Sequence, residues 1–207
     1  MNIRQLGLRP YAETLLEMQA FVEQSTTETN DEIWFVEHHP VYTQGTACDL
    51  QSLLASDIPV IKSDRGGQIT YHGPGQIVMY VMFNLKRHSL GVKAFVTMLE
   101  QTMINVLEGY QIFAERQQNA PGVYVDGAKI GALGLRFRKG FSYHGLSLNV
   151  NMDLAPFQNI DPCGYKGMPV TQMIDQFKIH NQPDKQSIFS DVQNALQKEL
   201  LSLLSES

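Results

Sequence analysis

The sequence lacks the features that would place the protein in a membrane or export it. Its longest uninterrupted apolar run, Ile77 to Phe83, has seven residues, whereas a helix that crosses a bilayer needs about 20. Residues 1–5 contain no apolar core of the kind found in a secretory signal. We therefore expect a cytoplasmic protein that spans no membrane.

Cysteine is scarce as well, because the chain has only two, Cys48 and Cys163. Two cysteines do not make a disulfide framework, and cytoplasmic thiols stay reduced. The sequence has no Cys-x2-Cys pair and no His-x3-His pair, which are typical spacings of zinc ligands. We therefore expect no metal site, and each cysteine is either a small packed side chain or a reactive thiol.

A strong excess of charge of either sign is missing. The 16 Lys and Arg residues against 21 Asp and Glu residues give a net charge of −5, whereas domains that bind nucleic acid are usually basic. A phosphate-binding loop is missing too. Gly122 and Gly127 have P-loop spacing, but Ala128-Lys129 follows where Gly-Lys is needed. The sequence therefore predicts no nucleic-acid partner and no phosphate cradle.

What the sequence does have is the composition of a globular protein. Its 207 residues, 43% of them hydrophobic, fit one domain spanning residues 1–207. Helical spacing of apolar residues predicts amphipathic helices at 11–24, 92–107 and about 185–204. Apolar runs and a hairpin turn at Asp126-Gly127 predict strands at 33–36, 76–85, 123–125, 128–138 and 141–150. Because hairpins dominate, we expect an α+β fold with a mixed or mostly antiparallel sheet packed with helices.

Residues 65–76 have an unusual mixture of glycine, polar and aromatic residues. They read Arg-Gly-Gly-Gln-Ile-Thr-Tyr-His-Gly-Pro-Gly-Gln and lead into the apolar strand. The adjacent Gly66 and Gly67 free the backbone for close approach to a ligand. Polar groups next to an apolar run suit the mouth of a pocket with an apolar interior. The alternative, that these glycines only form tight turns, stays open at this point.

Two later segments carry residues with chemical reactivity. Lys129 lies among small and apolar residues in a predicted strand. Most lysines are solvated, but a desolvated lysine is a usable general base. Cys163 lies between a proline and a glycine in a polar loop, a setting that favours an accessible thiol over a packed one. Such a thiol needs a nearby base or cation, and the candidates are Lys129, His72, His144 and Lys166. Cys48 has no comparable setting, and we interpret it as structural.

Three separated stretches resemble the octanoyltransferase family of lipoate biosynthesis. They are Arg65 to Gln76, quoted above; residues 127–134, Gly-Ala-Lys-Ile-Gly-Ala-Leu-Gly; and residues 144–151, His-Gly-Leu-Ser-Leu-Asn-Val-Asn, together with Asp-Pro-Cys-Gly-Tyr at 161–165. Enzymes of this family move an octanoyl group from acyl carrier protein to a lysine of lipoyl domains. The resemblance implies a fold similar to the catalytic domain of biotin and lipoate protein ligases.

The resemblance also assigns roles to residues and implies partners. It makes Cys163 the nucleophile and Lys129 its activating base, without a metal or nucleotide cofactor. The residues it places against the acyl substrate are Arg65, Gly66, Gly67, Gln68, Ile69, Thr70, Tyr71, His72, Ala132, Leu133, Gly134, Gly145, Leu146 and Ser147. The implied donor is acyl carrier protein. The implied acceptors are lipoyl domains of 2-oxoacid dehydrogenase complexes and the H protein of the glycine cleavage system.

The expected mechanism follows from this chemistry. Acyl exchange from a carrier thioester to Cys163 is nearly thermoneutral, and Lys129 would handle the proton. Backbone N–H groups near Cys163 or Gly67 would stabilise the oxyanion. His72 would orient Lys129 or the acyl carbonyl. The acyl tail is expected in an apolar slot near Tyr71, Val78 and Leu133.

Other functions fit some of the same residues. An ATP-dependent lipoate–protein ligase would need no nucleophilic cysteine, whereas an amidotransferase between lipoyl domains would use one. A non-catalytic binder of acylated domains would need neither Cys163 nor Lys129. A basic edge formed by Arg136, Arg138 and Lys139 is either a solvated strand edge or a docking surface for an acidic partner.

Overall fold

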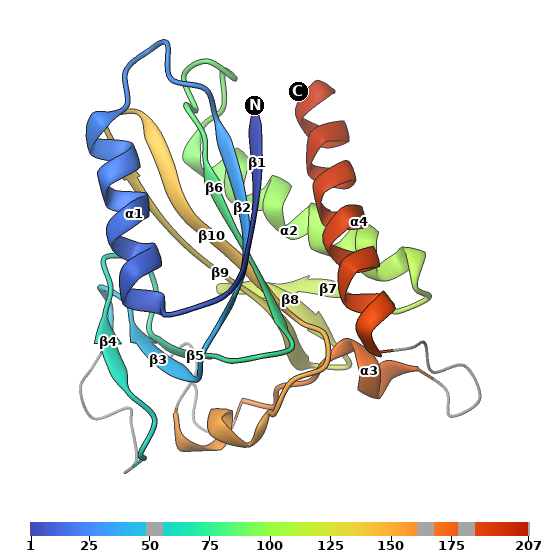
Figure 1. Cartoon of the computed structure of the whole chain (residues 1–207). Helices are drawn as coiled ribbons and strands as arrows, with labels where there is room; N and C mark the ends of the chain where they lie inside the picture. The colour runs from blue at the N-terminus through green and yellow to red at the C-terminus, as the bar shows by residue number, and fades with distance from the viewer. Residues whose placement is uncertain (49–55, 161–167, 178–184, 207) are drawn as a thin grey trace.

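The computed structural model describes residues 1–48, 56–160, 168–177 and 185–206 (Figure 1). The elements in chain order are β1 (Asn2–Arg9), α1 (Tyr11–Gln24), β2 (Glu32–His38), β3 (Val41–Gln44), β4 (Val60–Lys62), β5 (Ile69–His72), β6 (Gln76–Met82), α2 (Val92–Gly109), β7 (Glu115–Gln117), β8 (Ala120–Val125), β9 (Ala128–Arg138), β10 (Phe141–Asn149), η2 (Ala155–Asn159), α3 (Met173–Gln176) and α4 (Lys185–Ser205).

Over these residues the strands form two sheets. The larger has seven strands in the order β1-β2-β6-β10-β9-β8-β7, and the smaller has three in the order β4-β3-β5. The pairs β1–β2 and β3–β4 are parallel, and the remaining pairs are antiparallel. The predicted α+β fold with a mixed, mostly antiparallel sheet packed with helices is therefore confirmed.

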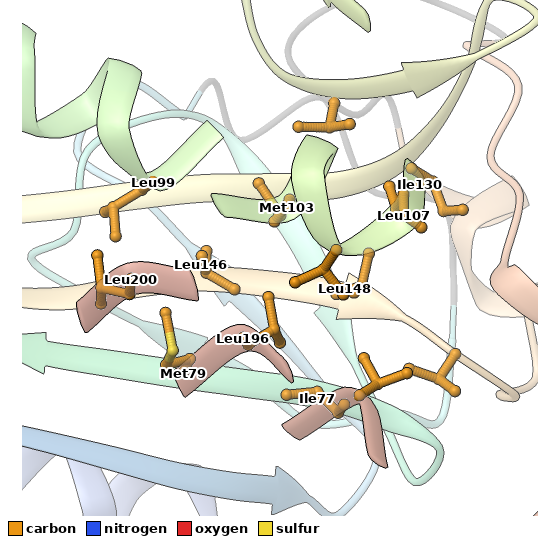
Figure 2. Close-up of a cluster of buried hydrophobic side chains, with 14 of the residues drawn as sticks. Ile77, Met79, Leu99, Met103, Leu107, Ile130, Leu146, Leu148, Leu196 and Leu200 are labelled. Atoms are coloured by element: carbon orange, nitrogen blue, oxygen red, sulfur yellow. The ribbon is translucent and has the colours of Figure 1, made fainter. Parts of the chain in front are cut away.

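One face of the larger sheet carries the main core. Alternate side chains of β6 and β10, among them Met79 and Leu146, point to this face and pack under α2 and α4 (Figure 2). Leu99 and Met103 of α2 are four residues apart and fully buried, as is Leu196 of α4. Burying one such side chain contributes about 1.5–3 kcal/mol. The apolar stripe of each helix therefore fixes how it lies on the sheet.

The opposite face of the larger sheet is covered by α1 (Figure 1). Met18 and Val22 of α1 are buried against Trp34 of β2 and Tyr80 of β6. The smaller sheet lies on this same side, because Val41 of β3 belongs to the same buried cluster. Two sheets and α1 therefore meet on one side of the molecule, and the pocket described below lies between them.

The structure confirms most of the predicted elements. The helices expected at 11–24, 92–107 and about 185–204 are α1, α2 and α4, and the expected strands are β2, β6, β8, β9 and β10. The patterns do not predict β1, whose side chains are mostly exposed, or the short strands β3, β4 and β5. No helix in the described part of the chain is long and apolar enough to cross a membrane.

Candidate active site

A pocket lies between the two sheets. The floor is formed by β6, β9 and β10, the roof by β5 and the loop before it, and Tyr11 of α1 also lines it. The space between the lining atoms is about 790 Å³, a figure that includes the open solvent at the mouth of the pocket. Val78 and Leu133 contribute apolar surface to the lining.

Most of the residues that the sequence places against substrate line this pocket. They are Arg65, Gly67, Gln68, Ile69, Thr70, His72, Ala132, Leu133, Gly134, Gly145, Leu146 and Ser147, and Lys129 lines it too. Their segments are far apart in the chain. β9 and β10 come together as a hairpin in which Ala132 pairs with Ser147 and Gly134 with Gly145. The β5 segment reaches the pocket from the other sheet.

Two of the expected substrate contacts lie away from the lining. Tyr71 alternates with its neighbours along β5 and packs against Tyr42 and Phe157, on the other side of the strand. The backbone N–H of Gly66 donates to the carbonyl of Leu135, 2.9 Å away. The apolar slot therefore includes Val78 and Leu133, as expected, but not Tyr71.

Lys129 is held in place from several directions. It is only 6% exposed, although lysine is rarely buried. Its backbone exchanges hydrogen bonds with residues 169–171, and its Nζ lies 5.3 Å from the centre of the Tyr124 ring, within the range of a cation–π contact. A Cβ on Gly122 would lie 2.5 Å from Lys129 Cε. Lys129 therefore occupies space that only a glycine at position 122 leaves.

Gly122 is itself fixed by a buried carboxylate. Its φ of +134° is one that side-chain-bearing residues rarely adopt. Its N–H donates to Glu100 Oε1 at 3.0 Å, and Glu100 also pairs with Arg116. Glu100 is 6% exposed. This helix residue thereby holds the glycine against which the lysine packs.

With Lys129 as the general base that the resemblance implies, we expect Gly122→Ala to lower acyl transfer by about a hundredfold, because a displacement of about 1 Å at such a group has this effect. The added methyl group clashes with Lys129 and must shift the amine. Steady-state kinetics measure the loss. The matched control is Gly109→Ala, where a Cβ meets nothing within 4 Å. Full activity of folded Gly122→Ala would contradict the role given to this packing.

A chain of side-chain hydrogen bonds runs under the pocket. His72 Nδ1 donates to Gln76 Oε1 at 2.6 Å, and Gln76 Nε2 donates to Asn149 Oδ1 at 2.9 Å. Asn149 Nδ2 in turn donates to the carbonyl of Thr171. This chain links β5, β6 and β10 to the segment beside Lys129. It fixes the His72 ring, whose Nε2 then has a lone pair available toward the pocket.

The hydrogen-bond chain begins at the buried His72, and a second buried histidine, His38, lies with its ring centroid 5.9 Å from that of His72. His72 stacks on Tyr11, and His38 accepts a hydrogen bond from the Tyr80 hydroxyl at Nε2, 2.7 Å away. Burial lowers the pKa of His72 to about 3 and the pKa of His38 to about 4. Both rings are therefore neutral at pH 7. His72 can accept a hydrogen bond or orient a group there, but it does not supply positive charge.

These two histidines make stability depend on pH. An unfolded His binds a proton near pH 6.5, whereas folded His38 and His72 resist protonation to about pH 4 and 3. The unfolded chain therefore binds more protons in this window, and the free energy of unfolding falls as pH drops from 6.5 toward 4. The slope is up to about 1.4 kcal/mol per pH unit for each histidine.

Urea unfolding at pH 7, 5.5 and 4.5 measures this slope. We expect His72→Gln to show a weaker pH dependence than the wild type. His39→Gln is the matched control, because that side chain is exposed. An unchanged slope in His72→Gln would contradict the assignment of a neutral buried ring.

A second histidine site stands at the other end of the pocket. His144 is 1% exposed and has φ of +60°, an uncommon conformation for a residue other than glycine. Its Nε2 donates to Asp64 Oδ1 at 2.8 Å, and the Tyr143 hydroxyl also donates to Asp64. Burial opposes ionisation of Asp64, but the bonds from His144, Tyr143 and Gln19 outweigh it and lower its pKa.

Burial also lowers the pKa of His144, so its ring is neutral with the proton on Nε2. The other nitrogen, Nδ1, has no hydrogen-bond partner among the described residues. A buried acceptor without a donor costs about 1–3 kcal/mol. A strained, unsatisfied histidine in the pocket lining is typical of a functional site rather than of a packing element.

The structure describes Cys48 but not Cys163. Cys163 lies outside the described residues, as do Lys166 and Tyr165. Phe157 and Val170, which lie a few positions before and after residues 161–167, both line the pocket. Cys48 is partly buried and packs against the cluster around Tyr42, which agrees with the structural role expected for it. No group of three or more metal-ligating side chains occurs among the described residues.

The expected basic edge is largely paired within the molecule. Arg138 and Lys139 contact the carboxylate of Glu23 on α1 at 2.7 and 2.8 Å. These contacts tie the β9–β10 hairpin to α1. Arg136 remains exposed. The side chains of Arg138 and Lys139 stay 58% and 45% exposed, so these pairs are compatible with a solvated strand edge and with a docking surface.

Several pocket residues are not predicted from the sequence. Tyr11, Gln76, Asn149, Phe157 and Val170 all line it. Gln76 and Asn149 belong to the quoted motifs, and two polar residues in apolar strands are a signal that could have identified them. Tyr11 gives no such signal, because an aromatic residue at the start of an amphipathic helix usually belongs to the core.

Comparisons with known proteins identify the family of this chain. Residues 10–200 match the family described as the lipoyl protein ligase A/B catalytic domain. An octanoyltransferase of Klebsiella pneumoniae strain 342 is 59% identical over 172 residues, 83% of this chain and 80% of that one. An octanoyltransferase of Erwinia tasmaniensis is 58% identical over 175 residues, 84% of this chain and 78% of that one.

A comparison with solved structures finds a lipoate protein ligase of similar fold. A bi-partite lipoate protein ligase from Thermoplasma acidophilum, solved in a study of that ligase and its lipoyl domain, superposes with a TM-score of 0.77. It is 15% identical and the match covers 99% of this chain and 83% of that one. This likeness establishes the fold, and the much closer sequence relatives establish the activity. The chain belongs to the octanoyltransferase family of the lipoyl protein ligase A/B catalytic domain, whose activity is octanoyl transfer in protein lipoylation.

Proposed function

We propose that this chain transfers octanoyl from acyl carrier protein to a lysine of a lipoyl domain through an acyl-thioester on Cys163, with Lys129 as general base. The observation that carries the proposal is Lys129 itself. Lysine is almost never fully buried, yet Lys129 is 6% exposed, packs on Gly122 and lines the pocket. A buried lysine that lines a pocket is a candidate general base.

In the first half-reaction, Cys163 attacks the carbonyl carbon of the octanoyl thioester. Lys129 accepts the thiol proton as the new carbon–sulfur bond forms. The bond to the phosphopantetheine sulfur then breaks, and that sulfur leaves with the proton returned by Lys129. One thioester replaces another, so no external energy source is needed.

In the second half-reaction, the amine of the target lysine attacks the acyl-Cys163 carbonyl. The carbon–nitrogen bond forms, the bond to Cys163 sulfur breaks, and Lys129 carries the amine proton to the departing thiolate. The product is an amide, which is more stable than a thioester. The thiol of Cys163 is thereby restored, and Lys129 carries no net gain or loss of protons over the cycle.

The position of the Gly67 loop narrows the choice of hydrogen-bond donors for the oxyanion. The backbone N–H of Gly67 is one candidate, but its loop lies at the level of Gly134 and Leu135, because Gly66 bonds to Leu135. Lys129 stands at the other end of the slot. We therefore propose backbone N–H groups close to Cys163 as the donors, with His72 Nε2 as an acceptor that orients an N–H of Lys129 or of the incoming amine.

The partners and conditions follow from this route. The donor is octanoyl acyl carrier protein, which brings its own phosphopantetheine, and the acceptors are lipoyl domains and the glycine-cleavage H protein. We propose that the reaction occurs in the cytoplasm and uses neither ATP nor a metal ion. The phosphopantetheine thiol acts as leaving group, so it belongs to the substrate.

A transfer assay separates this function from its alternatives. Octanoyl acyl carrier protein and unmodified lipoyl domain are mixed with the protein in the absence of ATP. The intact mass of the lipoyl domain is then measured by mass spectrometry. We expect a gain of one octanoyl group. Transfer only from free octanoate with ATP would favour a ligase. Faster transfer from an octanoylated lipoyl domain would favour an amidotransferase, and binding without transfer would favour a binding module.

A further inference from the structure

The loop before β5 is fastened across the floor of the pocket. Gly66 N–H donates to the carbonyl of Leu135 on β9, so the roof loop and the floor strand meet there. Three more backbone bonds hold the loop from the other side, from Gly45, Thr46 and Ala47. A Cβ on Gly45 would lie 2.2 Å from the Gly67 carbonyl. The loop is therefore held by backbone hydrogen bonds to β9 on one side and to residues 45–47 on the other.

The side chain of Arg65 completes this barrier. Its guanidinium donates to Thr43 Oγ1 and to the Thr43 carbonyl, at 2.9 and 2.6 Å, and it is buried. A Cβ on Gly134 would lie 3.0 Å from Arg65 Cδ and 3.2 Å from the Gly66 carbonyl. Gly134 is thus the last floor residue before the barrier. His144, which pairs with Leu135, lies in the adjoining row.

The other end of the slot is marked by the amine of Lys129. A Cβ on Gly122 would lie 3.2 Å from Lys129 Nζ and 2.7 Å from the carbonyl of Gly131. The Nζ atom therefore lies near the level of Gly131 on β9. From Gly131 to Gly134 the strand advances three residues, which is about 10 Å.

This length matches one acyl chain. An extended octanoyl chain has seven carbon–carbon bonds of about 1.5 Å in zigzag and reaches about 9 Å. Each further pair of methylenes adds about 2.5 Å and would meet the fastened loop. Beyond the barrier, Met82, Phe141 and Tyr143 are buried in the core cluster, so the slot does not continue along the strands.

We infer that residues 65–67, seated on Gly134 and Leu135, form an end stop that sets the acyl chain length at eight carbons, measured from Lys129. This inference rests on the proposed function, because it places the reacting carbonyl at Lys129. The polar groups of the stop are fixed by their own hydrogen bonds and do not swing aside.

The test is transfer from carriers bearing C4, C6, C8, C10 and C12 acyl groups. For the wild type we expect the highest kcat/KM at C8 and a decrease of about tenfold or more at C12. In Gly134→Ala the added methyl group shortens the slot at the end stop. The kcat/KM for C8 divided by the kcat/KM for C6 should therefore fall about tenfold or more. Ala132→Val narrows the slot at a position two residues nearer to Lys129 than Gly134. In this variant the acyl chain length with the highest kcat/KM should fall to C4.

Gly109→Ala is the matched control, since it adds the same methyl group where a Cβ meets nothing within 4 Å. Its length preference should equal that of the wild type. Thermal melts show which variants fold, and Ala132→Val carries the test if Gly134→Ala does not fold. Equal transfer of C12 and C8 by the wild type, or unchanged ratios in the folded variants, would overturn the end stop.

Failure of the proposed function gives a different result. If no acyl group is transferred from any carrier, calorimetry with free hexanoate, octanoate and decanoate decides the inference separately. Binding that peaks at octanoate, and moves to hexanoate in Gly134→Ala, supports the end stop without the transfer chemistry. Binding that ignores chain length, or no binding at all, overturns it.

Discussion

Replacing Cys163 with alanine should reduce octanoyl transfer by at least about a thousandfold, to the level without enzyme. The thioester route has no alternative nucleophile, because an alanine methyl group cannot form the acyl intermediate. Cys163→Ser should be nearly as inactive, since a hydroxyl is a much weaker nucleophile and leaving group than a thiol at neutral pH. The measurement is octanoyl incorporation into lipoyl domain over time.

The chain offers a matched control for this substitution. Cys48→Ala removes the other thiol, which packs against the Tyr42 cluster away from the pocket lining. We expect this variant to transfer octanoyl at a rate near that of the wild type. Substantial activity in Cys163→Ala, with the fold intact by circular dichroism, would contradict the covalent route and leave direct transfer or a binding module.

Replacing Lys129 should have the second-largest effect. Lys129→Ala removes the proposed base and should lower kcat by about a hundredfold to ten-thousandfold, the usual range for a general acid–base group. Lys129→Arg separates charge from proton transfer. An arginine keeps the positive charge beside Tyr124 but does not deprotonate in proteins, so we expect it to be as impaired as alanine.

The controls distinguish a catalytic role from a structural one. If Lys129 acts only as a packed cation, Lys129→Arg should keep most of the activity and the melting temperature should explain the rest. If Lys129 is the base, small amines added to Lys129→Ala should restore part of the rate, because the cavity left by the side chain admits them. Full activity of Lys129→Ala would remove this residue from the mechanism.

The helices follow from the sequence because their signal is local. Leu99, Met103 and Leu107 recur every four residues and are all fully buried. Part of the pocket could also be predicted, because the residue types at 65–76 suit a pocket mouth and the family resemblance supplies residues 132–134 and 145–147. What the motifs alone do not contain is how the three segments approach one another.

The parts that could not be predicted depend on contacts between distant residues. β1 pairs with β2 as an edge strand whose mostly exposed side chains give no alternation. Asp64 and His144 are 80 positions apart and bond only because the roof loop crosses β9. In the sequence, Gly122 looks like an ordinary turn glycine. Only the structure shows that the Lys129 side chain packs against it.

The measurement that tests the central claim most directly is the mass of the intact enzyme after mixing with octanoyl acyl carrier protein in the absence of ATP and acceptor. The account predicts a gain of one octanoyl group that hydroxylamine removes, that peptide mapping places on Cys163, and that Cys163→Ala does not acquire. An enzyme that turns over while remaining unmodified, or that carries the acyl group on another residue, would contradict it.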